Sequence, residues 1–191
     1  MNKKIGALVF GAILLFAGCG SYYTLVNETP PLGNLKAFNT LSIGWLDLGD
    51  DKAKTYGFEG AEASKWPDLI NEINLKAFPG FLKDFMPGKT IHTVASKSQA
   101  PQKDGLIVTF TEVNYAQQTS TGAQVMFGSF AGSDTLDLVI HFADANTGQE
   151  MLTSKVSLST KAGTGYSQWS FEGRVTNGAY NLARYISEKV M

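Results

Sequence analysis

The strictest pattern in the sequence is an alternation of apolar residues between positions 136 and 158. In its first half, Leu136, Leu138, Ile140 and Phe142 alternate with Asp137, Val139 and His141. Successive side chains of a strand point to opposite faces, so this alternation predicts a strand with one face in the core. The turn sequence "DANTGQ" follows, and "EMLTSKVSLST" then resumes the alternation, which predicts a β-hairpin. The chain must therefore build a sheet and cover one of its faces.

Three further strands are predicted before this hairpin. Residues 38–46 alternate through Leu41, Ile43 and Trp45, and "KTIHTVAS" forms a short strand. The segment "GLIVTFTEVNYAQ" forms a stronger strand, because Leu106, Val108 and Phe110 share a face.

Two main helices are predicted from apolar stripes at spacings of three and four. In the first, Ser64 is the expected N-cap, Pro67 is tolerated in the first turn, and Pro79-Gly80 interrupts the helix. A short second helix, "FLKDF", then ends before Pro87-Gly88. Ser170 caps the last helix. The two stripes are Trp66, Leu69, Ile70, Ile73 and Ala77, and Phe171, Val175, Ala179, Leu182, Ile186 and Val190.

This order of elements predicts the fold class. A helix after the first strand allows a crossover, whereas the later strands favour hairpins. We expect a single α+β domain with a mixed or mainly antiparallel sheet and two main helices packed on one face. The opposite face is expected to be wetter, since Asp137, His141, Thr109 and Thr111 would lie there.

The N-terminus has the order of a secretory signal peptide. Lys3 and Lys4 precede an apolar run over residues 5–16, and the small residues Ala17 and Gly18 follow. A membrane-spanning helix needs about 20 apolar residues. This run is shorter, and polar sequence follows at once.

The only cysteine of the chain, Cys19, stands directly behind this run. The sequence "FAGC" resembles the lipobox of bacterial lipoproteins. The resemblance implies that Cys19 receives a diacylglycerol on its sulfur, that cleavage occurs before it, and that its new amino group is acylated. The alternative is a buried free cysteine in an uncleaved N-terminal helix.

The lipoprotein interpretation divides the chain into three parts. Residues 1–18 are a cleaved signal peptide, residues 19–35 a lipid-anchored tether, and residues 36–191 a periplasmic α+β domain. Pro30-Pro31 and Gly33 disfavour regular structure in the tether. Gly20 follows the cysteine where aspartate would favour the inner membrane, so the resemblance implies an outer-membrane location facing the periplasm.

Composition excludes some classes of function. The formal net charge is −1, which does not suggest a nucleic-acid-binding protein. With one cysteine no disulfide forms within the chain, so stability must come from packing. Hydrophobic residues make up 43% of the sequence, which indicates a globular chain.

The most informative internal stretch is "VMFGSFAGSDTLDLVIHFADANTGQEML". A glycine and aromatic segment precedes an alternating strand that ends in Asp-x-x-Thr-Gly. This resembles a family of uncharacterised bacterial lipoproteins with a domain of unknown function, over about residues 36–190. The final helix, with Gly173, Gly178 and Ala179, is also similar. More distantly, the β-α-β layout resembles penicillin-binding-protein activator lipoproteins and the periplasmic domain of the curli secretion channel.

Two candidate contact surfaces contain aromatic residues. Met126, Phe127 and Phe130 form a possible apolar contact for a partner or a lipid surface, or else belong to a glycine-rich bend at Gly128 and Gly132. A second group would line a groove at which a peptide strand adds, or would pack in the core. This group comprises Tyr115, Tyr166, Trp169 and Phe171.

Metal and catalytic sites find little support. Residues 144–150 faintly resemble a calcium loop, but a hairpin turn explains Asn146 and Gly148. Asp47, Asp50 and Asp51 could gather a cation, but a solvated acidic loop is the favoured interpretation. His92 and His141 lie on separate predicted strands, and no nucleophile or phosphate motif accompanies them. We predict no metal, no cofactor and no catalytic residues.

The sequence favours a lipid-anchored, non-enzymatic interaction or accessory module of the bacterial envelope. Its expected partners are the membrane, through the N-terminal lipid, and an envelope protein. Two alternatives remain open. One is an envelope enzyme acting on cell-wall material, and the other is a subunit of a secretion or transport complex.

Overall fold

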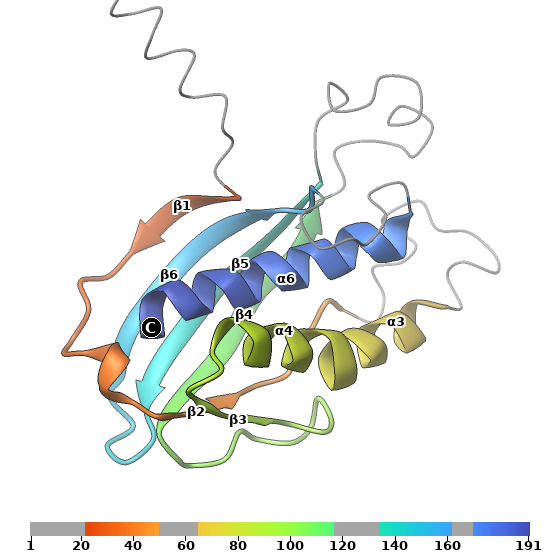
Figure 1. Cartoon of the computed structure of the whole chain (residues 1–191). Coiled ribbons are helices and arrows are strands. Elements are labelled where there is room, and N and C mark those ends of the chain that lie inside the picture. Colours follow the sequence, from red (N-terminus) through yellow and green to blue (C-terminus); the bar gives the residue numbers. More distant parts are fainter. Residues whose placement is uncertain (1–21, 50–64, 117–133, 162–169) are drawn as a thin grey trace, which may run out of the picture.

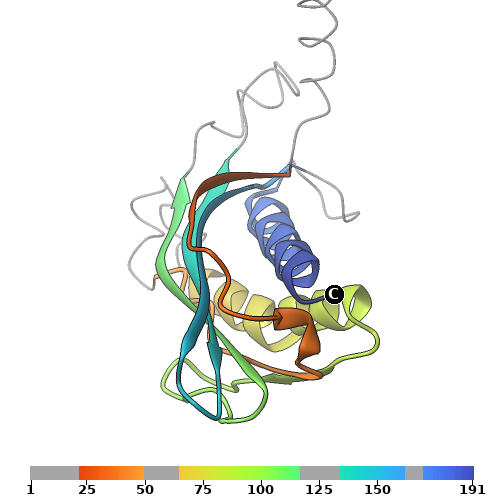
Figure 2. The same ribbon diagram turned by 90° about the vertical axis from the view of Figure 1, so that its left-hand side faces the viewer.

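The computed structural model describes residues 22–49, 65–116, 134–161 and 170–191. They form one six-stranded mixed sheet with the order β1-β6-β5-β4-β2-β3. The helices cover one face of this sheet and leave the other face open, as the edge-on view shows (Figure 2). The predicted α+β fold class is therefore confirmed.

The strands combine a parallel and an antiparallel half. β2 (Thr40–Ile43) is parallel to both β3 (Thr90–Thr93) and β4 (Leu106–Ala116). β5 (Thr135–Asp144) and β6 (Glu150–Ser159) form the predicted hairpin, and β5 pairs antiparallel with β4 on its other side. The helical segment between β2 and β3 supplies the crossover that parallel neighbours require.

β1 (Tyr23–Glu28) is an edge strand antiparallel to β6. It falls inside the stretch expected to be an irregular tether, so that expectation is wrong for these residues. Pairing continues beyond β1, because Thr29 N–H donates to Thr153 O at 3.0 Å and Leu32 N–H to Met151 O at 2.7 Å. The segment then passes the short 3-10 helix η1 (Leu35–Ala37) before β2. The segment from Tyr23 to Leu32 therefore pairs with β6, and Pro30-Pro31 does not prevent this pairing.

The first helical region is continuous from α3 (Trp66–Glu72) through η3 (Ile73–Ala77) to α4 (Phe78–Phe85). The prediction that Pro79-Gly80 interrupts it is wrong. A proline inside a helix lacks one N–H and collides with the carbonyl four residues earlier. Here η3 is a wider π-helical segment, in which Phe78 N–H donates to Ile73 O. Pro79 therefore lies in the first turn of α4, where a proline is tolerated. The predicted N-cap Ser64 lies outside the described residues.

α6 (Phe171–Val190) crosses the sheet beside the first helical region (Figure 1). Its predicted cap is confirmed, because Ser170 Oγ accepts from Gly173 N–H at 3.0 Å. The stripe from Val175 to Val190 is buried against the sheet. Its C-terminal end lies beside η1 (Figures 1 and 2).

A bulge in β4 decides which face its last residues occupy. The β4–β5 register shifts between Thr111 and Asn114, and Glu112 has φ +51°. The extra residue turns Tyr115 onto the helix-covered face, where it is fully buried opposite Leu136. The open face keeps Thr109, Thr111, Asp137 and His141, as predicted from their alternation.

Candidate functional site

Three chain connections meet at one end of the sheet. Across neighbouring strands, Tyr23 pairs with Leu158, Leu158 with Leu136, and Leu136 with Tyr115. We call the end that holds this row the connection end. Three strand spacings make it about 14 Å wide. The N-terminal segment, the connection between β4 and β5, and the connection from β6 to α6 all join the sheet there (Figure 1).

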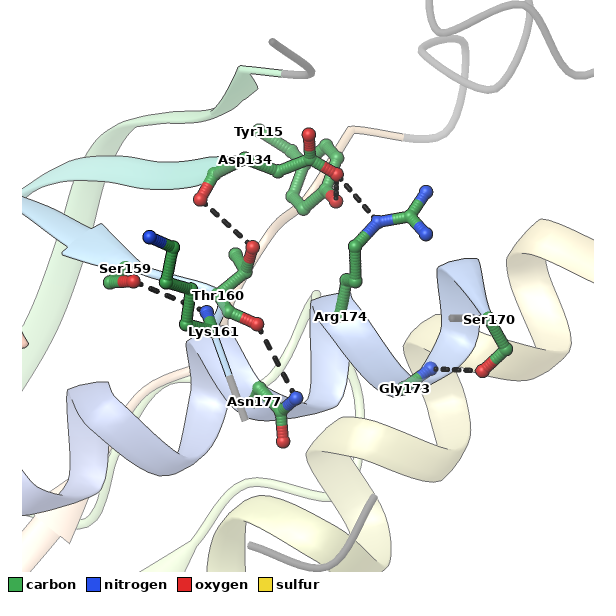
Figure 3. Close-up of polar contacts among 9 residues, drawn as sticks. All are labelled: Tyr115, Asp134, Ser159, Thr160, Lys161, Ser170, Gly173, Arg174 and Asn177. Atoms are coloured by element: carbon green, nitrogen blue, oxygen red, sulfur yellow. Dashed lines mark hydrogen bonds and ion pairs between the residues drawn. The ribbon is translucent and has the colours of Figure 1, made fainter. Parts of the chain in front are cut away.

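A buried polar cluster fixes the connection end. Asp134 precedes β5, and its Oδ2 atom accepts from the Tyr115 hydroxyl and from Arg174 Nε, the latter at 2.7 Å (Figure 3). Arg174 and Asp134 are 1% and 0% exposed. Burial, together with the hydrogen bond to Asp134, raises the pKa of the Tyr115 hydroxyl, so this group stays protonated. The cluster joins the end of β4, the start of β5 and the first turn of α6.

Backbone groups next to the cluster extend it to β6. The Thr160 hydroxyl and N–H donate to Asp134 O at 2.8 and 3.1 Å, and Asn177 Nδ2 donates to Thr160 O at 3.3 Å (Figure 3). Gly178 lets α6 approach β5, since a Cβ there would lie 3.3 Å from Leu136 Cβ. These contacts therefore fix the two ends of the β4–β5 connection and the N-terminal turns of α6.

The N-terminal strand is clamped to α6 by aromatic and charged side chains. Arg184 Cζ lies 4.1 Å from the centroid of the Tyr22 ring, and the Tyr23 and Tyr185 rings meet edge-on at 4.9 Å. Burial raises the pKa of the Tyr22 hydroxyl, and the nearby Glu188 carboxylate raises it further. These contacts hold the first described residues against the C-terminal helix.

Glu28 closes the other end of the same clamp. Its Oε2 accepts from Ser154 Oγ at 2.8 Å and from the Tyr185 hydroxyl at 2.9 Å, and it pairs with Lys189 Nζ at 2.6 Å. Burial alone would raise the pKa of Glu28, but hydrogen bonds from Lys189, Ser154 and Tyr185 outweigh it and lower the pKa. We call the contacts of Tyr22, Tyr23 and Glu28 with α6 the β1 clamp.

Several of the predicted site residues lie outside the described part of the chain. They are Cys19, the possible partner contact Met126, Phe127 and Phe130, and the aromatic residues Tyr166 and Trp169. Of the proposed aromatic groove, Tyr115 is a core residue, so the core-packing alternative holds for it. Sequence analysis missed the cluster around Asp134 and the β1 clamp.

His141 lies on the open sheet face with both ring nitrogens occupied. Its Nε2 is 2.8 Å from Thr111 Oγ1, and its Nδ1 is 2.6 Å from Glu150 Oε1. Glu150 also accepts from the Thr153 hydroxyl. These bonds lower the pKa of Glu150, with Thr153 contributing most. His141 is therefore a surface histidine whose two ring nitrogens both have hydrogen-bond partners. The other histidine, His92, lies on β3.

The acidic residues that the structure describes form a turn and a surface ion pair, whereas Asp50 and Asp51 of the predicted acidic loop lie outside the described residues. Asn146 N–H donates to Asp144 Oδ1 at 2.8 Å and Gly148 has φ +69°, so the hairpin turn explains this loop. Asp47 pairs with Lys97 at 2.8 Å. Among the residues the structure describes, no group of three or more His, Cys, Asp or Glu side chains could hold a metal ion.

Three of the grooves on the surface are lined entirely by described residues. One has a volume of about 360 Å³ between α3 and α6, another about 290 Å³ beyond the carboxyl ends of β2 and β3, and another about 270 Å³ beside Met151. Neither Thr111 nor His141 lines any of them. The groove between α3 and α6 is lined in part by Asp68, Glu72 and Glu172. The groove beyond β2 and β3 is lined in part by Trp45, Asn71 and Lys97, and the groove beside Met151 by Pro30, Leu32 and Glu150.

Comparison with known proteins gives a distant structural likeness. No protein-family model and no curated protein matches the chain, so the sequence resemblance to a lipoprotein family stays a prediction. Two solved structures are similar in outline: a PelC dodecamer from Paraburkholderia phytofirmans, with a TM-score of 0.43 and 9% identity, and a single-residue variant of that dodecamer, with 0.42 and 10%. Each match covers 88% of this chain and 99% of the other. Matches this distant do not indicate a function.

Within residues 22–49, 65–116, 134–161 and 170–191, no helix has the length and apolar character needed to cross a bilayer.

Proposed function

We propose that this chain is a lipid-anchored protein of the bacterial envelope that acts by binding a partner and not by catalysis. In this proposal residues 1–18 are removed and Cys19 carries the lipid. Gly20 favours the outer membrane, with the domain facing the periplasm. Two or more acyl chains make such an attachment stable.

The observation that carries the proposal is the short distance between Cys19 and the folded domain. Three peptide steps separate Cys19 from Tyr22, whose ring packs under Arg184. At about 3.5 Å for each residue, these steps reach about 11 Å. A lipid on Cys19 would therefore hold the connection end next to the bilayer, instead of letting the domain move on a long tether.

This geometry also suggests where the partner binds. The β4–β5 connection begins after Ala116 and returns before Asp134, at the connection end. It contains the proposed contact residues Met126, Phe127 and Phe130. We propose that they meet an envelope protein embedded in, or bound to, the same membrane. The mechanism is confinement, because anchoring near one leaflet raises the effective concentration of the domain for partners there.

The alternative of an envelope hydrolase rests on one specific observation. Thr111, His141 and Glu150 place a hydroxyl, an imidazole and a carboxylate in hydrogen-bond order. Against it, Thr111 is an exposed residue of the open sheet face. Binding remains the better supported function.

The test is a comparison of the native chain with Cys19→Ser in intact bacterial cells. We expect the native protein, and not the variant, to incorporate labelled palmitate and to fractionate with the envelope. Crosslinking followed by purification through a C-terminal tag should then recover one abundant partner from native cells alone. Full cellular function of a soluble Cys19→Ser protein would overturn the anchoring role.

A further inference from the structure

Exposed apolar side chains gather on the N-terminal segment. Leu25 is 44% exposed and Val26 is 60% exposed, and both lie on β1 only a few residues after the clamped Tyr22. In the described residues, the other large apolar side chains with comparable exposure are Leu32, Leu75 and Met191. Single exposed apolar residues are ordinary, but two adjacent ones on an open sheet edge call for a physical reason.

The geometry of β1 explains why they are exposed. Among the described strands β1 pairs with β6 alone, and its register shifts between Leu25 and Asn27, so Val26 is the extra residue of a bulge. Edge strands are normally protected from further pairing by charged side chains. The only charged residue of β1 is Glu28, and Lys189 of α6 already pairs with it.

We propose that Leu25 and Val26 dock on the surface of the bilayer that carries the lipid of Cys19. This proposal rests on the proposed anchoring function and names the surface that the domain presents to the membrane. The occupant follows from chain length. Cys19 lies within about 11 Å of Tyr22, and Val26 is four residues further along the strand, or about 13 Å. Both side chains therefore reach the head groups and the outer acyl region when β1 lies along the membrane surface.

The β1 clamp makes this docking directional. Tyr22, directly before β1, and Glu28, its last residue, are both held by α6. If β1 docks on the membrane, the edge of the sheet and α6 are therefore placed at the membrane as well. The bulge at Val26 also breaks the regular edge that strand pairing with a second copy would use. A lipid surface needs no such register.

The experiment couples the chain to membranes chemically. Protein beginning at Cys19 is attached through its single thiol to maleimide lipid in phosphatidylethanolamine and phosphatidylglycerol vesicles. The reference is the same protein with Cys19 capped by N-ethylmaleimide and mixed with the same vesicles. Hydrogen exchange is then followed by mass spectrometry in peptides that cover residues 22–32.

We expect exchange in β1 to slow several-fold in the coupled native chain and to stay unchanged in the capped chain. The double variant Leu25→Thr, Val26→Thr keeps residues suited to a strand and should lose this protection. The matched control Leu75→Thr removes a similarly exposed apolar side chain, 49% exposed, from the helical layer and should keep the protection.

Two results would overturn the docking. One is equal exchange in the coupled and capped chains, and the other is full protection in the double variant. Thermal unfolding of each variant shows whether a lost effect reflects a lost fold. The proposed function and the docking can fail separately. Absence of palmitate labelling in bacteria would refute the proposed lipid anchor. The hydrogen-exchange result would still test the docking, because there the chain is coupled to the membrane chemically.

Discussion

Arg174 Nε lies 2.7 Å from Asp134 Oδ2, in a place that solvent does not reach. Removing one partner of a buried ion pair leaves the other charge uncompensated, which typically costs about 3–5 kcal/mol. We therefore expect Arg174→Met to lower the free energy of unfolding by about 3 kcal/mol or more, measured by urea denaturation.

The matched control is the exposed pair between Lys155 and Glu112, whose Nζ and Oε2 atoms are 2.6 Å apart. Water screens an exposed pair and already solvates both of its charges, so Lys155→Met should have little effect on stability. Similar losses for the two variants would show that the Asp134 cluster does not stabilise the connection end.

The β1 clamp predicts a specific pH dependence. The folded-state pKa of Glu28 is lowered, so its contribution to stability is fully present above its ordinary pKa of about 4.5. That contribution is lost as the pH falls through the lower, folded-state pKa. Glu28→Gln should be less stable than the native chain near pH 6, and the gap should close below about pH 4.

Urea denaturation of both proteins at a series of pH values measures this gap. Other carboxylates, including Glu150, titrate alike in the two proteins, so the difference isolates Glu28. A gap that stays constant down to about pH 3 would contradict the prediction.

Much of the fold follows from periodicity alone. The alternation at Leu136–Phe142 and the stripe from Val175 to Val190 predict a hairpin and a helix that the structure contains. These patterns succeed because each element buries one face. β1 fails this test, since its edge position leaves Leu25 and Val26 exposed and its pairing depends on β6, which is distant in the sequence.

The candidate site was harder to predict, because its contacts join distant residues. Arg174 and Asp134 are 40 positions apart, and an arginine in a helix normally faces solvent. One signal was available: Arg174 falls three residues after Phe171 and directly before Val175, on the side of the predicted apolar stripe. Tyr115 was misleading for another reason, since the bulge at Glu112 reverses which face its side chain occupies.

The histidine on the open face tests the hydrolase alternative. In the binding interpretation, His141→Ala removes only exposed hydrogen bonds to Thr111 and Glu150, so stability should change by less than about 1 kcal/mol. Cells carrying His141→Ala should keep full function. Loss of function in a variant that still folds and carries palmitate would favour a catalytic role for this row of residues.

Asn74 links the helical layer to the chain after β2. Its side chain accepts from Leu46 N–H at 2.8 Å and donates to Leu46 O and Ile70 O, both at 3.0 Å, and it is 4% exposed. Asn74→Ala leaves buried backbone groups without partners, each costing about 1–3 kcal/mol. We expect thermal unfolding to occur well below that of the native chain. Asn71→Ala, at an exposed position one turn earlier, should change it little; equal shifts would contradict the role of Asn74.

Gly105 and Gly148 separate two effects of a glycine in a left-handed conformation. Both have positive φ, +66° and +69°, so alanine at either position costs about 1–2 kcal/mol in backbone strain. A Cβ on Gly105 would also lie 2.2 Å from Thr40 O, where β2 and β4 meet, whereas Gly148 has nothing within 4 Å. Backbone atoms of a sheet cannot move aside cheaply, so overpacking should add about 1–3 kcal/mol or more at Gly105. Urea denaturation should therefore find Gly105→Ala clearly less stable than Gly148→Ala, and equal losses would mean that β2 shifts to accommodate the methyl group.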